Sequence, residues 1–252
     1  MHPLEHQLFL LKNDDEAQHL MRFFKTAPGE YGEGDRFLGV RVPVTRSLVK
    51  KYRDTVVIDD VDKLIKSDWH EVRLAGLLLL IEIYRRYKRR NSVDRQRQVV
   101  DYYLSVLDRG NNWDLVDLVA PKILGGWIVD NPEYVDILYD LAEMDGCLWH
   151  QRVAMVSTWT IIRSGNYAPT LRLAQRFITH KHDLIHKVSG WMLREIGKRG
   201  GMDELIYFLD KYAACMPRTM LRYAIEQFPE DKRRHYLSLK TPMHSAQSIP
   251  PE

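Results

Sequence analysis

The sequence contains little cysteine, no long apolar run and few signals for β-strands. Its two cysteines, Cys147 and Cys215, form no C-x-x-C pair and are too few for a disulfide-rich fold. This usage favours a reducing compartment, and we expect a cytoplasmic protein. The longest apolar run, residues 75–81, is far shorter than the roughly 20 residues of a membrane-spanning helix. The charged amino-terminal residues lack the apolar core of a signal peptide.

An excess of one charge is also missing, because 37 basic side chains face 34 acidic ones and leave a net charge of +3. A balance this small does not by itself indicate a nucleic-acid-binding protein, so the distribution of the charges has to decide. The 252 residues, 45% of them hydrophobic, suffice for one long or two ordinary domains with a buried core.

A polar position recurs at nearly constant spacing along the chain. Four of these positions are basic and one is acidic: Arg73, Asp117, Arg152, Lys187 and Arg222. The steps between them are 44, 35, 35 and 35 residues, and the neighbouring apolar residues repeat with them. Such a period is typical of a solenoid of helix pairs, in which each pair buries its apolar face against its neighbours. Equivalent positions then share one inner wall, which is predicted to be cationic with a single carboxylate.

Helix signals dominate the chain, with prolines where the first turn of a helix tolerates them. The predicted helices cover residues 43–53, 59–66, 70–90, 92–108, 114–124, 132–144, 149–164, 169–179, 183–199, 203–214, 217–228 and 230–239. We predict one domain over residues 1–240. Residues 241–252 have no apolar period, and we expect a disordered tail there.

Two tryptophans accompany the recurrent positions. Trp113 precedes Asp117 by four residues and Trp191 follows Lys187 by four, so each pair lies on one face of a helix. On an inner wall, an aromatic ring and a carboxylate would then face the same small volume, with Arg152 between the two tryptophans. This combination suits an anionic polymer that carries one electron-poor centre.

Each of these residues also has a simpler interpretation. Tryptophan is usually largely buried, so Trp113 and Trp191 could be core residues. Asp117 could be an ordinary acid of a helix face that pairs with Arg152 of the next repeat. The remaining cations could tie stacked repeats together: Arg73, Lys187 and Arg222.

Two further clusters have little support as sites. Residues 85–90, Arg-Arg-Tyr-Lys-Arg-Arg, could bind an anion, or they could be a solvated helix end where the helix dipole favours cations. His180, His182 and His186 do not complete a metal site, because only the last two share a helical face and no acid or cysteine joins them. We therefore expect no metal and no cofactor.

At these residues the chain resembles the AlkD-like family of DNA alkylation repair glycosylases. The likeness extends from residues 37–43, through 67–73 and the three segments at 111–117, 148–154 and 187–195, to residues 217–224. The first 35 residues match less distinctly. The resemblance implies an all-α fold, namely a HEAT-like helical-repeat solenoid with a concave groove that binds DNA. It also implies hydrolysis of the N-glycosidic bond of alkylated purines.

The resemblance assigns roles to individual residues. The catalytic aspartate of the family falls on Asp117, its groove tryptophans on Trp113 and Trp191, and its phosphate-contacting arginine on Arg152. The other recurrent cations would add phosphate contacts: Arg73, Lys187 and Arg222. The expected partner is duplex DNA that carries 3-methyladenine or 7-methylguanine, bound by a monomer.

The implied chemistry needs only one carboxylate, because an alkylated purine is cationic and leaves readily. Asp117 would stabilise the positive charge that develops on the sugar and would orient the attacking water. The alternative is a non-catalytic HEAT-like protein that binds damaged or branched DNA, or a protein partner, through the same groove. Asp117 distinguishes the two, since a carboxylate that faces phosphates would only repel them in a binding protein.

Overall fold

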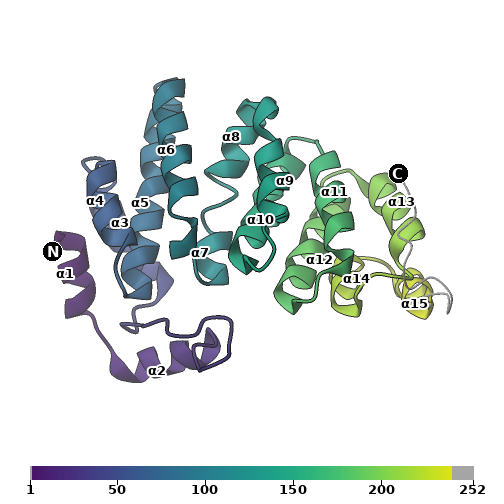
Figure 1. The fold of residues 1–252 in the computed structure, drawn as a ribbon, viewed down its shortest axis with the longest axis horizontal. Coiled ribbons are helices and arrows are strands. Elements are labelled where there is room, and N and C mark those ends of the chain that lie inside the picture. Colours follow the sequence, from purple (N-terminus) through teal and green to yellow (C-terminus); the bar gives the residue numbers. More distant parts are fainter. Residues whose placement is uncertain (1, 240–252) are drawn as a thin grey trace. The chain divides into compact units, whose positions relative to one another are not determined.

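The computed structural model describes residues 2–239, which contain fifteen α-helices and no β-strand (Figure 1). In this part of the chain, Arg36 and Trp69 form an isolated β-bridge. The predicted all-α class is confirmed. The contacts divide the chain into two compact units on either side of Asp130, and the single domain predicted over 1–240 and the solenoid groove stay predictions. The predicted tail, 241–252, lies outside the described residues.

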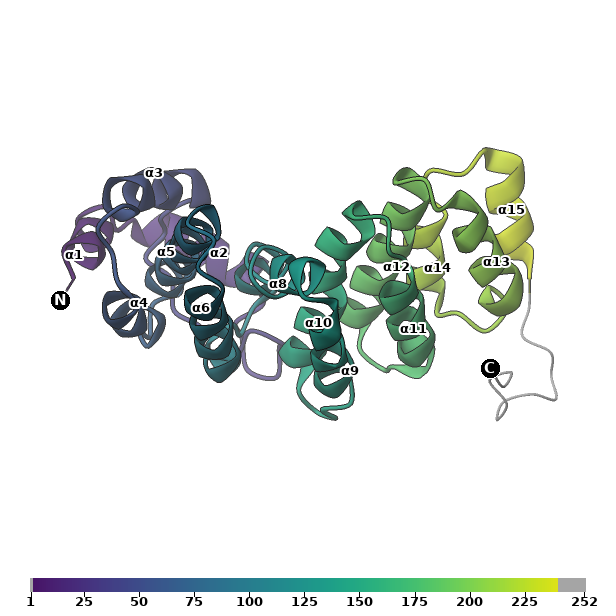
Figure 2. The ribbon, with the colours of Figure 1, turned by 90° about the horizontal axis from the view of Figure 1, so that it is seen from above.

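The first unit is built around one long helix. Its elements are α1 (Pro3–Leu10), α2 (Asp14–Phe23), α3 (Val42–Tyr52), α4 (Ile58–Ile65), α5 (His70–Arg89), α6 (Val93–Ser105), a 3₁₀ turn (Leu107–Arg109), α7 (Trp113–Asp117) and α8 (Leu124–Asp130). Residues 74–81 make α5 apolar on every side, and a helix of this kind has to be buried. Accordingly, α3, α4 and α6 pack around it, with α5 between α3 and α4 in Figure 2.

The second unit repeats helix pairs along the chain. Its elements are a 3₁₀ turn (Pro132–Tyr134), α9 (Asp136–Ala142), α10 (Leu148–Arg163), α11 (Ala168–Arg176), a second 3₁₀ turn (Phe177–Thr179), α12 (Asp183–Lys198), α13 (Met202–Tyr212), α14 (Arg218–Ala224) and α15 (Glu230–Ser238). Helix α12 packs against α10, α11, α13 and α14. It approaches α14 closely at Gly190, where a Cβ atom would lie 2.3 Å from the carbonyl oxygen of Met220.

The helix predicted over 114–124 is wrong in its extent. It is split into α7, a turned segment over residues 118–123, and α8. Pro121 accounts for the break, because proline has no N–H to donate and its ring clashes with the carbonyl four residues earlier, which is that of Asp117. As a result Asp117 is the last residue of a short helix rather than an interior position of a long one.

Helices α1 and α2 are absent from the sequence-based prediction because they lie outside the repeat. Their start signals are nevertheless present. The side chain of His2 accepts a hydrogen bond from Leu4 N, and Pro3 occupies the first turn of α1. The side chain of Asn13 caps α2, whose first turn carries three acidic residues, as the helix dipole favours.

A buried carboxylate holds the loop between α2 and α3. Glu71 accepts hydrogen bonds from three consecutive backbone N–H groups, those of Leu38 (2.8 Å), Gly39 (2.9 Å) and Val40 (3.1 Å). Gly39 has a φ of +82°, and a Cβ there would lie 2.1 Å from the carbonyl oxygen of Asn13. The loop is therefore fixed between α2 and α5, and it leads directly into α3.

The Glu71→Gln variant should lower the free energy of unfolding by about 2–3 kcal/mol, because the amide nitrogen would face backbone N–H groups that now meet a carboxylate. Glu204→Gln is a matched control, since Glu204 is exposed on α13 and should change stability by less than about 0.5 kcal/mol. Urea unfolding of both variants measures the difference. Equal stability of the two variants would contradict the role assigned to Glu71.

Candidate functional site

Helix α7 carries the predicted acid and is too short to be stable alone, so its position depends on its anchors. Asn112 is fully buried and caps α7, with its Oδ1 accepting a hydrogen bond from Trp113 N at 2.9 Å. Its Nδ2 donates to the carbonyl oxygen of Phe24 at 3.2 Å. One side chain thus joins the start of α7 to the end of α2.

A pocket of about 500 Å³ lies between α2, the start of α3 and α7. It is lined by Glu16, His19, Leu20, Phe23, Phe24, Arg41, Val42, Pro43, Trp113, Asp114, Asp117 and Leu118. Trp113 and Asp117 therefore share one pocket, in keeping with their spacing of four residues. We call it the Asp117 pocket.

Aromatic rings form one wall of the Asp117 pocket. Trp113 stacks on Phe24 with ring centroids 5.1 Å apart, and Phe23 meets it edge-on at 5.9 Å. Phe24 is buried, whereas Phe23 is 56% exposed and Trp113 is half-buried. Trp113 also packs against the buried cluster of Ala17, Phe24 and Phe37, so it contributes both to the core and to the lining of the pocket.

Helix α2 supplies residues to this pocket that sequence reasoning missed. Phe23 is one, and His19 and Glu16 are others. Glu16 accepts two hydrogen bonds from Arg41, at 2.9 and 3.1 Å, which link α2 to the start of α3. The sequence does carry a signal for these residues, because Leu20, Phe23 and Phe24 form an apolar stripe that follows an acidic first turn. The repeat does not include α2, so the periodicity does not predict it.

A buried ionic network includes Asp114, a residue of the pocket lining. His70 on α5 lies between two carboxylates, with Nδ1 2.7 Å from Asp35 Oδ2 and Nε2 2.9 Å from Asp114 Oδ2. Asp35 is also bonded by the guanidinium of Arg73. Since Asp114 follows Trp113, this network fixes α7 against α5.

The network decides the protonation state of His70. Burial would lower its pKa, yet the charges and hydrogen bonds of Asp114 and Asp35 outweigh burial and raise the pKa to about 9. For Asp35, burial opposes ionisation, but the bonds and charges of His70 and Arg73 prevail and lower its pKa. At neutral pH the group is therefore an imidazolium between two carboxylates.

The burial of Arg73 argues against the phosphate contact predicted for it. Arg73 is 3% exposed. Its guanidinium donates to Ser67 O at 3.0 Å and to Asn111 Oδ1 at 2.9 Å, as well as to Asp35. It fits the structural alternative, a cation that ties neighbouring segments together, and we leave it out of the proposed DNA surface.

Asp117 is only partly exposed to solvent. Asp117 is half-buried, and Tyr103 of α6 is buried. Burial and the charge of Asp117 raise the pKa of Tyr103, which places the two side chains in each other's field. A carboxylate in such a position interacts more strongly with a nearby positive charge than one in bulk water.

The other predicted site residues belong to the second unit. Arg152 on α10 is 5% exposed, and its guanidinium donates to Leu184 O at 2.8 Å, which joins α10 to the start of α12. Lys187 and Trp191 lie four residues apart on α12, and both are half-buried. Lys187 pairs with Asp183 at 2.8 Å. Arg222 is exposed on α14, the helix that packs against α12.

The three histidines near the start of α12 serve local packing. His180 lies 2.9 Å from Gln151 Oε1 through its Nε2, and the Nδ1 of His182 accepts from Leu184 N at 3.1 Å.

Within residues 2–239, no group of three or more His, Cys, Asp or Glu side chains is placed to hold a metal ion. Over the same range no helix has the length and apolar character needed to cross a membrane.

The raised pKa of His70 predicts a loss of stability at alkaline pH. Because the folded value of about 9 exceeds the ordinary value of 6.5, the contribution is complete below pH 6.5 and disappears as the pH rises through 9. The advantage of the wild type over His70→Gln in urea unfolding should shrink by about 3 kcal/mol between pH 6 and pH 10. NMR titration of the imidazole is the direct check, and a midpoint at or below pH 6.5 would contradict the network.

Known proteins resemble this chain in fold and in family. No curated protein sequence matches the chain. Among solved structures, it is similar to a protein described as a predicted DNA alkylation repair enzyme from Enterococcus faecalis, with a TM-score of 0.65 and 17% identity, over 87% of this chain and 97% of that one. At this identity the likeness shows the fold alone. The family model for DNA alkylation repair enzymes matches residues 4–228. The chain therefore belongs to the DNA alkylation repair enzyme family.

Proposed function

We propose that this protein is a DNA glycosylase that hydrolyses the N-glycosidic bond of N3- and N7-alkylated purines in duplex DNA. Its family indicates a role in the repair of alkylated DNA. The observation that carries the finer proposal is the Asp117 pocket, in which Asp117 and an aromatic wall face the same space, while the other two carboxylates of the lining, Glu16 and Asp114, bind Arg41 and His70.

The substrate class follows from what the Asp117 pocket offers. Alkylation at N3 or N7 gives the purine a positive charge, so the base leaves as a neutral molecule without prior protonation. A general acid is unnecessary, and a single carboxylate suffices. A cationic base also gains from the face of Trp113 or Phe23, an interaction worth about 0.5–2 kcal/mol depending on desolvation.

Asp117 would act on the sugar rather than on the base. As the bond from C1′ to the purine nitrogen breaks, its electron pair leaves with the base and C1′ becomes positively charged. A half-buried carboxylate stabilises that charge more than it stabilises the neutral sugar of the ground state, which lowers the barrier. Water then bonds to C1′ and releases a proton, which Asp117 would accept.

Residues of the second unit would hold the nucleic acid. We assign phosphate contacts to Lys187 and Arg222, and contact with the sugar or base to Trp191. Arg152 is about as buried as Arg73 and donates to a backbone carbonyl, so we leave it out for the same reason. The exposure of Arg222 and the shared helix face of Lys187 and Trp191 support these roles. Phosphate contacts of this type position a protein on DNA without reading its sequence.

The Asp117→Asn variant should lose at least about 100-fold in the rate of base release, because the amide retains the shape but not the charge that stabilises the sugar. DNA binding should stay equal or become tighter, since a group that repels phosphates is removed. The measurement is release of free 7-methylguanine, and then 3-methyladenine, from duplex DNA under single-turnover conditions. Asp94→Asn is the matched control, because it removes the same charge from an exposed position of α6 and should leave the rate unchanged.

The outcomes separate the two candidate functions. Turnover that survives Asp117→Asn would remove Asp117 from catalysis. If the wild type binds duplex DNA but releases neither base, the non-catalytic DNA-binding alternative is correct.

A further inference from the structure

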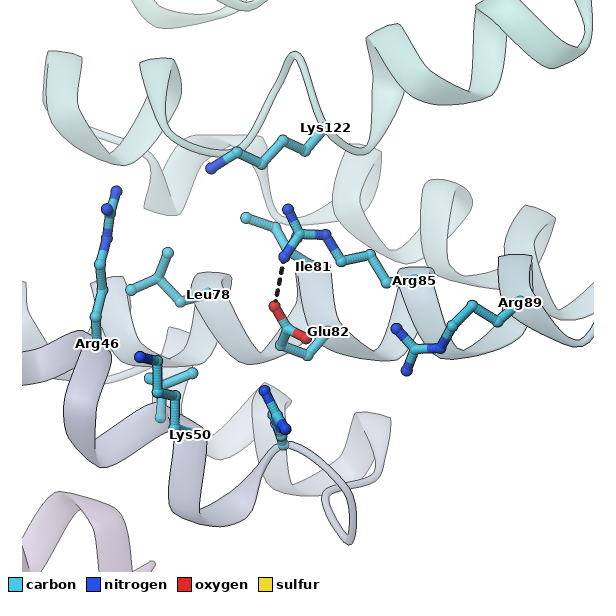
Figure 3. A pocket seen from close by; sticks show the side chains of 10 residues that line it. Arg46, Lys50, Leu78, Ile81, Glu82, Arg85, Arg89 and Lys122 are labelled. Atoms are coloured by element: carbon cyan, nitrogen blue, oxygen red, sulfur yellow. Dashed lines mark hydrogen bonds and ion pairs between the residues drawn. The ribbon is translucent and has the colours of Figure 1, made fainter.

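A second pocket in the first unit is lined by cations and shares no residue with the Asp117 pocket. It has a volume of about 590 Å³ and lies between α3, α5 and the turned segment that follows α7 (Figure 3). Six basic side chains line it: Arg46, Lys50, Arg53, Arg85, Arg89 and Lys122. We call it the basic pocket.

The charges of the basic pocket are not balanced. Glu82 is the one acidic residue of its lining, and Arg85 already binds it at 2.7 Å. Arg53 is paired with the neighbouring Asp54 at 3.5 Å. Within the described chain, no carboxylate lies at ion-pair distance from the other four cations: Arg46, Lys50, Arg89 and Lys122.

The six cations surround one space; five of them are exposed to solvent, and Lys122 is half-buried. Figure 3 shows the amine of Lys122 directed into the space between the guanidinium groups of Arg46 and Arg85. Burial and the charges of these two arginines lower the pKa of Lys122, a sign that the three groups repel one another. An anion placed among them would relieve this repulsion, so the pocket is prepared for negative charge.

The floor of the basic pocket strengthens this preference. Val49, Leu78 and Ile81 are all buried, and they form an apolar base under the charged rim. Next to such a surface of low dielectric constant, an ion pair is stronger than in open water. A site of this kind favours a compact anion with several charges over scattered counter-ions.

The alternative of a solvated helix end does not account for the whole cationic stretch at residues 85–90. Arg86 donates to the backbone carbonyl of Val56 at 3.1 Å and also to that of Arg53, so it closes the end of α3. Lys88 pairs with Asp130. Arg85 and Arg89, four residues apart, instead turn the same face of α5 toward the pocket.

We propose that the basic pocket binds a ligand that carries two or more adjacent phosphoryl groups. Four of its cations are arginines, whose planar guanidinium groups match two phosphate oxygens at once. A single phosphodiester would neutralise only part of the excess charge, whereas neighbouring phosphoryl groups would neutralise most of it. This chemistry is available from consecutive phosphates of a nucleic-acid strand or from a free oligophosphate.

The test compares two double variants that remove the same two charge types. Lys50→Gln with Arg89→Gln alters the basic pocket, and Lys51→Gln with Arg90→Gln alters the neighbouring, equally exposed residues that are not part of its lining. Binding of tripolyphosphate is measured by calorimetry and binding of undamaged duplex DNA by fluorescence anisotropy, both on the full chain. The pocket variant should lose about tenfold or more in affinity, and the surface variant no more than about twofold.

The ligand source follows from which probe shows the selective loss. Selective loss for tripolyphosphate establishes a site for free oligophosphates, and selective loss for DNA alone identifies the strand as the source. Equal losses in the two variants with both probes, or no loss in either, overturn the proposal. Citrate that binds as tightly as tripolyphosphate, with the same selectivity, would overturn the phosphoryl assignment. None of these results depends on base release, so the glycosylase proposal stands or falls separately.

Discussion

The Asp117 pocket depends on one charge, the buried imidazolium of His70. It joins three separate segments, since Asp35 precedes α3, His70 begins α5 and Asp114 lies in α7. The ring of Phe37 stacks on the imidazole of His70 with centroids 4.2 Å apart, and the ring of Phe24 is tilted toward it at 5.2 Å. The aromatic wall of the pocket therefore packs against a cation. With Arg73 as second cation, the two carboxylates are balanced, and loss of any member would leave a buried charge without its partner.

The two pockets of the first unit use charge in opposite ways. Around Asp117 the ionic groups are paired beneath an aromatic wall, and the exposed surface is mainly apolar. In the basic pocket the cations outnumber the acids, and among the described residues only Arg53 and Arg85 of the six have a carboxylate at ion-pair distance. The turn after α7 connects the two, because Asp117 ends the helix and Lys122 follows within the turned segment. A change in this turn would therefore reach both pockets.

The sequence predicted the parts of the structure that repetition encodes. The all-α class, most helices from α3 onward and the common pocket of Trp113 and Asp117 follow from period and spacing. The break at Pro121 was visible as a proline but was outweighed by the apolar pattern around it. The wall supplied by α2 was not predictable from the repeat, because α2 is outside it. The internal role of Arg73 depends on Asp35, a residue 38 positions away whose proximity no spacing reveals.

The bond from Asn112 to the carbonyl of Phe24 spans 88 positions of the chain, and it has a consequence for the order of folding. Contacts this distant in sequence form late, because the intervening chain has to be ordered first. During synthesis, α2 leaves the ribosome long before α7 exists. Phe24 can meet Phe37 early, but the apolar stripe of α2 lacks Trp113 as a partner until most of the first unit has emerged. The Asp117 pocket is thus among the last features of the first unit that the growing chain can complete.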